Sequence, residues 1–102
     1  MNNNSNIEAA METVKKMSPK QRARLIVEVE YNKAVEKHKE FPKSLNGGQA
    51  IIIEEYLEMS QAINDFRETF HREDMSHLVE ETCHTIVTLF RFLEQRLDNG
   101  NN

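Results

Sequence analysis

The chain is 102 residues long, of which 38% are hydrophobic and 29% are charged, with three glycines and two prolines. That length fits one domain, and that composition is typical of a helical protein rather than a disordered one. The net charge of -4 argues against a nucleic-acid or anionic-membrane partner, since either needs a basic surface.

A cytoplasmic location is expected from three further features. No apolar run approaches the roughly 18 residues of a membrane span. The amino terminus lacks the apolar core of a signal peptide. Cys83 is the only cysteine, so the chain cannot form an intrachain disulfide.

The two ends of the chain are rich in asparagine, and we expect residues 1–6 and 98–102 to be flexible tails around a single all-α domain at residues 7–97. Apolar residues at helical spacing predict a short first helix over residues 7–17.

A second helix is predicted over residues 19–39. Ser18 is a good N-cap, and Pro19 suits the first helical position. Phe41-Pro42 ends the helix, because proline disfavours the helical conformation in the residue before it.

Residues 43–48 are the most loop-like stretch, since Gly47 and Gly48 permit backbone conformations that other residues avoid. An acidic helix is predicted from about Gln49 to Phe70. Its apolar residues recur at alternating steps of three and four: Ile52, Tyr56, Met59, Ile63, Phe66 and Phe70.

The last helix is predicted from about Ser76 to Leu97, with a broad apolar stripe made of Val79, Cys83, Ile86, Phe90, Leu93 and Leu97. So wide a stripe is more than one small chain covers. We therefore expect an all-α helical bundle of three main helices and a short N-terminal one, oligomerising through the apolar faces of the last two helices.

Glu54, Glu55 and Glu58 place three carboxylates on about one turn of the acidic helix. Like charges at this spacing repel each other by a few tenths of a kcal/mol per pair. A bound divalent cation would turn that repulsion into affinity. The alternative is a solvated acidic face, which is ordinary in a protein with 17 acidic residues.

Glu81 and His84 stand three apart on the last helix, in a polar stripe that also contains His77, Thr88, Arg91 and Gln95. The pair could complete a metal site with Glu55 and Glu58, and Arg91, two turns away, could reach a bound phosphate. The alternative is that this stripe is simply the solvated face of an amphipathic helix.

The second helix ends in a basic cluster made of Lys33, Lys37, His38 and Lys39. Cations are favoured near a helix carboxyl terminus, which is sufficient to explain the cluster. The functional interpretation is a positively charged lip for a polyphosphate, with Lys37 as a phosphate-binding residue.

The order of these motifs resembles the small MazG-like nucleotide pyrophosphohydrolases, including those of phage origin. The resemblance covers roughly residues 37–97 and is carried by Phe41-Pro42, Gly48-x-Ala50-x-Ile52-x-Glu54-Glu55-x-x-Glu58, Glu81-x-x-His84 and Arg91-Phe92-Leu93-Glu94. That all-α family is marked by an ExxE pair, a spacer and an ExxD pair, and it works as dimers or tetramers.

What the resemblance implies is hydrolysis of a (deoxy)nucleoside triphosphate to a monophosphate and pyrophosphate. Glu55, Glu58, Glu81 and His84 would hold Mg²⁺, with Glu54 as a ligand or as the residue that orients the attacking water. Lys37 and Arg91 would contact the phosphates.

His84 departs from the family pattern, which usually has aspartate there. Imidazole suits Mn²⁺ or another transition metal better than Mg²⁺. One alternative is therefore a catalytically degenerate relative that binds nucleotide, metal or a partner. Another is a carboxylate-bridged redox metal site, because Glu81-x-x-His84 matches the Glu-x-x-His unit of di-iron bundles.

Overall fold

Four helices make up the chain in the computed structural model, which describes residues 2–99 and their side chains from Ser5 to Asp98. The helices are α1 (Asn2–Lys16), α2 (Pro19–Lys37), α3 (Leu45–Thr69) and α4 (Arg72–Asn99), and residues 2–99 contain no strand. The predicted all-α fold class is confirmed. None of these helices is long and apolar enough to span a membrane.

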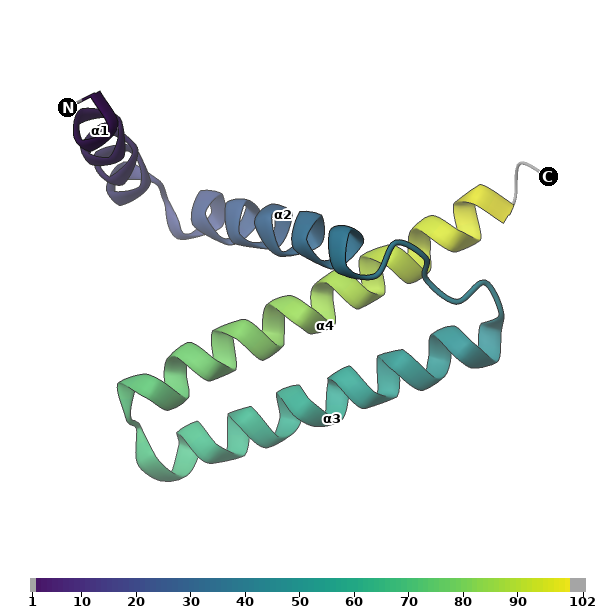
Figure 1. The fold of residues 1–102 in the computed structure, drawn as a ribbon. Coiled ribbons are helices and arrows are strands. Elements are labelled where there is room, and N and C mark those ends of the chain that lie inside the picture. Colours follow the sequence, from purple (N-terminus) through teal and green to yellow (C-terminus); the bar gives the residue numbers. More distant parts are fainter. Residues whose placement is uncertain (1, 100–102) are drawn as a thin grey trace.

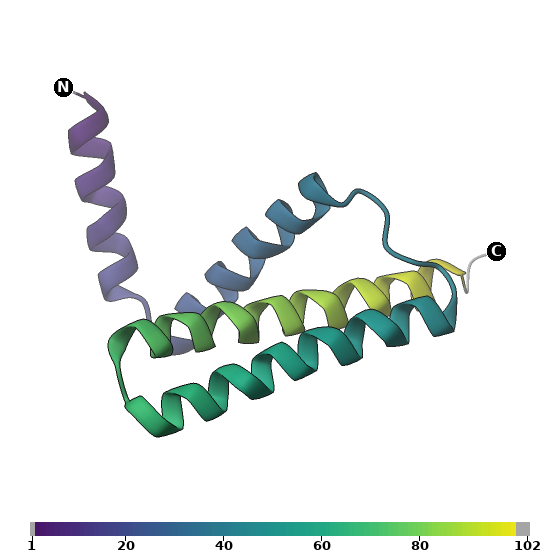
Figure 2. The same cartoon turned by 60° about the horizontal axis from the view of Figure 1, so that its bottom comes forward.

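Helices α3 and α4 form a long antiparallel hairpin (Figure 2). Phe70 ends α3 in the left-handed conformation, with φ of 54°, and its backbone N–H donates to the Phe66 carbonyl at 2.8 Å. The buried apolar residues of the hairpin are Ala62, which is 1% exposed, Cys83 and Val87. The small Ala62 side chain permits close approach of the two helices, so this hairpin holds most of the core.

Helix α2 crosses α4 (Figure 1). Its start matches the prediction, because the Ser18 hydroxyl accepts from the Gln21 N–H at 3.2 Å and the Gln21 side chain accepts from the Ser18 N–H at 2.8 Å. No residue of α2 is buried. Its attachment to α4 includes Tyr31, whose hydroxyl donates to Glu94 and whose ring meets Phe90 edge-on.

Helix α1 projects away from the other three helices (Figures 1 and 2). Every side chain of α1 from Ser5 onward is exposed, including the apolar residues Ile7, Met11 and Val14. Its apolar stripe is therefore uncovered in the single chain.

The loop predicted at residues 43–48 is wrong from Leu45 onward, where α3 begins. Ser44 caps α3, its hydroxyl accepting from the Gly47 N–H at 3.0 Å, and both glycines lie in the first helical turn. Gly48 serves close packing: a Cβ added there would lie 2.6 Å from Cδ1 of Phe92. Phe92, which falls among the polar positions of the last helix, is thus covered by the start of α3.

The other helix boundaries also differ from the sequence prediction. Helix α1 begins at Asn2, within the expected tail, and α2 ends at Lys37 rather than Lys39. Helix α4 begins at Arg72, because the connection after α3 is only Phe70 and His71, and it continues to Asn99. Met1 and residues 100–102, the rest of the expected tails, lie outside the described residues.

The polar and apolar faces of α4 are placed in an unexpected way. Glu81, Thr88 and Arg91, from the predicted polar stripe, are 8–9% exposed, whereas Phe90 and Leu93, from the apolar stripe, are at least half exposed. The polar stripe thus faces the other helices. The alternative interpretation of this stripe as a solvated face is wrong for these three residues.

Candidate functional site

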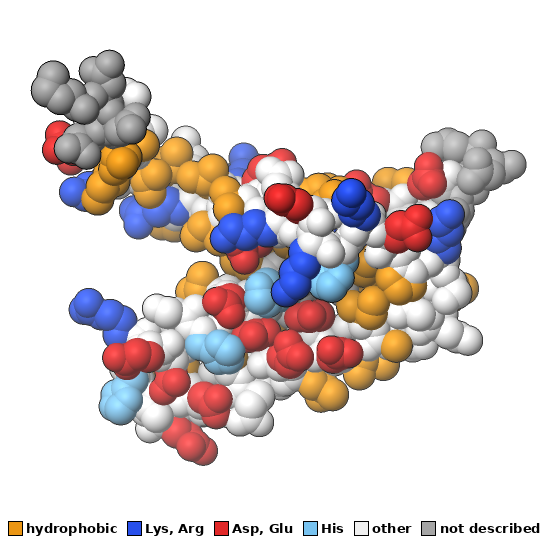
Figure 3. Space-filling model, viewed as in Figure 1, with side chains coloured by type: hydrophobic (Ala, Val, Ile, Leu, Met, Phe, Trp, Pro, Cys, Tyr) orange, Lys and Arg blue, Asp and Glu red, His pale blue; other side chains and the backbone are white. Residues whose placement is uncertain are grey.

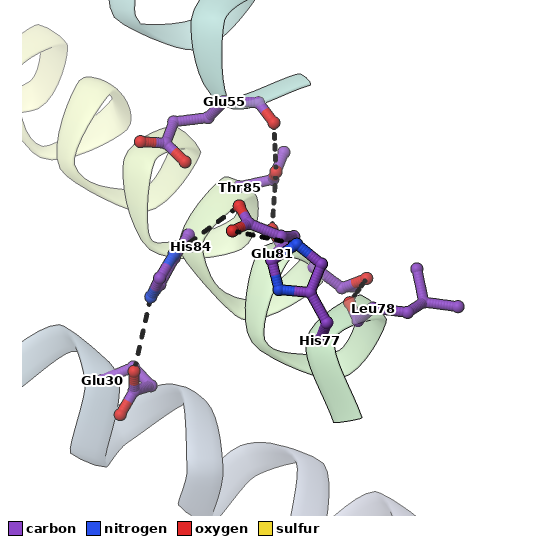
Figure 4. A network of polar contacts seen from close by, with 8 residues as sticks. Glu30, Glu55, His77, Leu78, Glu81, His84 and Thr85 are labelled. Carbon is purple, nitrogen blue, oxygen red and sulfur yellow. Dashed lines mark hydrogen bonds and ion pairs between the residues drawn. The ribbon is translucent and has the colours of Figure 1, made fainter. Parts of the chain in front are cut away.

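Glu55, Glu81 and His84 meet where the middle of α3 lies against α4 (Figure 4). One ligand atom from each residue lies within 4.8 Å of the other two. Two carboxylates and one imidazole at this spacing could hold a metal ion. The structure thus brings together three of the four residues that the sequence predicts as metal ligands.

Thr85 fixes the register of the two helices at this point. Its hydroxyl oxygen lies 2.9 Å from the Glu81 carbonyl on its own helix and 3.2 Å from the Glu55 carbonyl on α3. The side chain is buried, and so is its contact with the Glu81 carbonyl. Sequence reasoning missed Thr85, because a threonine on a helix carries no signal of an interhelical hydrogen bond.

The carboxylates at the site lack the partners that buried acidic groups normally have. Oε2 of Glu55 and Oε2 of Glu81 are both shielded from solvent and have no hydrogen-bond partner among the described residues. Burial, and next the nearby charge of Glu58, raise the pKa of the Glu55 carboxyl. Unsatisfied buried carboxylate oxygens are costly, and a bound cation would satisfy them.

His84 lies between two carboxylates. Its Nδ1 is 3.8 Å from Oε2 of Glu81, and its Nε2 is 3.6 Å from Oε1 of Glu30 on α2. Glu30 stands outside every acidic motif of the sequence and was not predicted as a site residue. Only the crossing of α2 over α4 shows that it belongs to this site.

The remaining acidic candidates lie at the edge of the site. Glu54 is exposed and lines the cavity described below. Glu58 is exposed and is not among the three converging ligands, although its charge acts on Glu55. A second group, His77, Glu80 and Glu81, also has ligand atoms within 4.8 Å of one another, but His77 and Glu80 are exposed.

A cavity of about 740 Å³ lies between α2 and the hairpin, beside the three ligands. Its lining contains the carboxylates of Glu30, Glu40, Glu54 and Glu55, the imidazole of His84, and the cations Lys33, Lys37 and Arg91. Figure 3 shows acidic and histidine side chains gathered where α2 faces the hairpin, with Lys and Arg side chains toward α2. A ligand that carries both phosphates and a metal ion would find cationic groups for the former and carboxylates for the latter in this lining.

Arg91 is only partly available to a ligand. Its guanidinium donates to the His38 carbonyl at 2.7 Å and lies 5.4 Å from the centre of the Phe41 ring. Both partners belong to the segment after α2, so Arg91 also holds that segment on α4. Lys37 is exposed at the rim of the cavity.

Comparison of the chain with protein-family models, with curated proteins and with solved structures finds no match.

Proposed function

We propose that the protein is a metal-dependent nucleotide pyrophosphohydrolase that cleaves a nucleoside triphosphate to a monophosphate and pyrophosphate. The observation that carries the proposal is the pair of buried carboxylate oxygens, on Glu55 and Glu81, that face His84 without partners. The adjoining cavity has the size of a small-molecule site, and its lining includes cationic residues suited to phosphates. The reaction class itself is suggested by the order of the sequence motifs, which resembles that of the MazG-like pyrophosphohydrolases.

In this proposal Glu55, Glu81 and His84 would hold the cation, either Mg²⁺ or a transition metal such as Mn²⁺. The cation would neutralise the polyphosphate and lower the pKa of an attacking water. Lys37 and the free N–H groups of Arg91 would bind phosphate oxygens across the cavity, which positions the reacting phosphorus. Glu54, at the cavity edge, would orient the water, and Glu58 would add charge from outside.

The second candidate is a non-catalytic relative that binds nucleotide or metal. Two observations favour it. His84 stands where the resembled family has aspartate, which removes one negative charge from the site. Arg91 already donates to a backbone carbonyl, which reduces its availability to a phosphate.

We also propose that the chain associates with further copies of itself. Its exposed surface of 8127 Å² exceeds the roughly 6,000 Å² expected of a compact protein of this mass. Its radius of gyration of 16.7 Å exceeds the expected value of about 13 Å. Leu93 and Leu97 on α4 are more than half exposed. Sedimentation at micromolar concentration should show a dimer or tetramer that Leu93→Glu dissociates, and a monomeric wild-type chain would contradict this.

The reaction is tested by product analysis over ribo- and deoxyribonucleoside triphosphates, with Mg²⁺ and separately with Mn²⁺. We expect monophosphate and pyrophosphate from the wild-type chain and a loss of at least about 100-fold in Glu81→Gln, which removes a ligand charge but keeps the side-chain shape. Glu68→Gln is the matched control, since Glu68 is an exposed glutamate of α3 outside the site.

Three outcomes separate the candidates. Pyrophosphate release that Glu81→Gln abolishes supports the enzyme. Metal binding without turnover, also lost in Glu81→Gln, supports the binding relative. Full activity in Glu81→Gln, or no binding of metal by the folded wild-type chain, contradicts the site itself.

A further inference from the structure

The two ring nitrogens of His84 face different surroundings (Figure 4). On the Nδ1 side lies Oε2 of Glu81, which is buried and without a hydrogen-bond partner. On the Nε2 side lies Oε1 of Glu30, which comes from α2. The imidazole thus links the two helices of the hairpin site to a third helix.

A neutral imidazole presents one bare nitrogen and one N–H, so only one of its nitrogens binds a metal ion. Glu81 is about nine-tenths buried, and its unpartnered Oε2 makes the Nδ1 side the better place for a cation. On the other side, Oε2 of Glu30 is already paired with the Lys33 ammonium at 3.1 Å. This pairing makes Glu30 a weak metal ligand, but Oε1 remains free to accept a hydrogen bond.

We propose that Glu30 is a positioning residue that accepts the Nε2–H of His84 and so presents Nδ1 to a transition-metal cation held with Glu81 and Glu55. The inference rests on the metal binding in the proposed function and adds the tautomer, the orienting group and the class of cation. Metal-binding histidines commonly donate their other N–H to a carboxylate, which fixes the ring and raises its basicity.

The placement of α2 fits this role. Helix α2 has no buried residue, yet it brings Glu30 within 3.6 Å of His84. That distance is slightly longer than a hydrogen bond, and a small movement of either side chain closes it. The cation would then tie the lightly packed α2 to the hairpin through His84.

The tautomer is tested by NMR of the full chain with ¹⁵N-labelled histidine, titrated with Zn²⁺ alone. The signals absent from His84→Gln identify His84 among the four histidines. We expect the Zn²⁺-bound shift at Nδ1 and a proton on Nε2. Metallation of Nε2 would overturn the inference, because Glu30 would then lie beside the metal rather than opposite to it.

The role of Glu30 is tested by calorimetric Zn²⁺ binding to Glu30→Ala and to the control Glu28→Gln, an exposed glutamate of the same helix. We expect an affinity loss of 10- to 100-fold in Glu30→Ala, typical of an outer-shell carboxylate, and none in the control. Glu30→Gln retains an acceptor oxygen and should recover part of the loss.

Equal Zn²⁺ affinity in Glu30→Ala and in the wild type would overturn the inference while leaving the metal site in place. A folded wild-type chain that binds no Zn²⁺ would overturn the inference, and a lack of Mg²⁺ and Mn²⁺ binding as well would remove the proposed metal site with it.

Discussion

The hairpin of α3 and α4 contains the buried apolar residues Ala62, Cys83 and Val87, whereas the arm formed by α1 and α2 has no buried side chain among its described residues. The three converging ligands all lie on the hairpin. The arm contributes Glu30, Lys33 and Lys37 to the cavity from outside. The hairpin therefore sets the ligand geometry, and α2 adds charged side chains to the cavity without burying a residue of its own.

The largest expected effect is on the packing of the hairpin. Ala62→Leu adds a branched side chain to a position that is 1% exposed, and overpacking of this kind costs about 1–3 kcal/mol of unfolding free energy. The same change on the arm, Ala23→Leu, is at an exposed position and should stay within about 0.5 kcal/mol. Urea unfolding of both variants measures the contrast, and equal costs would contradict the division of the molecule into two regions.

The charge of Glu55 gives a pH-dependent prediction for the metal-free chain. Because burial and Glu58 raise the Glu55 pKa, the folded chain holds a proton there more tightly than the unfolded chain does. The free energy of unfolding should therefore fall as pH rises above the ordinary glutamate range and through the raised pKa. Unfolding of Glu55→Gln in EDTA should lack this fall and show greater stability than the wild type at neutral pH. Lower stability of the variant at neutral pH would contradict the prediction.

A smaller effect is expected where the arm attaches to the hairpin. Tyr31→Phe keeps the edge-on contact with Phe90 but removes the hydrogen bond to Glu94. In the wild type the Tyr31 hydroxyl lies 2.8 Å from Oε1 of Glu94. The substitution should lower the free energy of unfolding by about 1 kcal/mol at most, since the hydrogen bond is exposed to solvent. Hydrogen exchange should show faster opening of α2 with α3 unchanged, and a matching acceleration in α3 would mean that the two regions open together.

The smallest effect on the hairpin is expected from removal of α1. A single helix of 15 residues is marginally stable in water, and the described side chains of α1 are all exposed. Deletion of residues 2–16 should change the melting temperature of the hairpin by no more than about 2 °C. In the intact chain, the backbone amides of α1 should exchange quickly with solvent. Slow exchange would mean that another copy of the chain covers the helix.

The helices were predictable because each has a strong local pattern: the Ser18-Pro19 start of α2, and apolar residues at steps of three and four in α3. The start of α3 was missed because its glycines look like a turn, and only the distant Phe92 explains Gly48. The local sequence around a residue does not identify a packing partner that lies dozens of residues away in the chain.

The site residues were predictable only where they belong to a motif within one helix. Glu55, Glu81 and His84 follow from spacing within single helices, and the hairpin brings them together. Glu30 could not be found this way, because its role depends on the angle at which α2 crosses α4. The inward orientation of the α4 polar stripe was also beyond a helical pattern, which marks two faces but not which one is covered.

The two-residue connection between α3 and α4 has a consequence for how this chain tolerates changes in length. Glu55 and Thr85 lie fifteen residues on either side of Phe70, and their contact shows that positions across the hairpin are matched by distance from the turn. One residue inserted between the turn and Glu55 would rotate that carboxylate by about 100° away from His84. Seven residues are close to two full helical turns. If seven were inserted into each helix between the turn and its ligands, the ligands would still face each other. Natural length variants of this hairpin should therefore differ by matched pairs of turns and not by single residues.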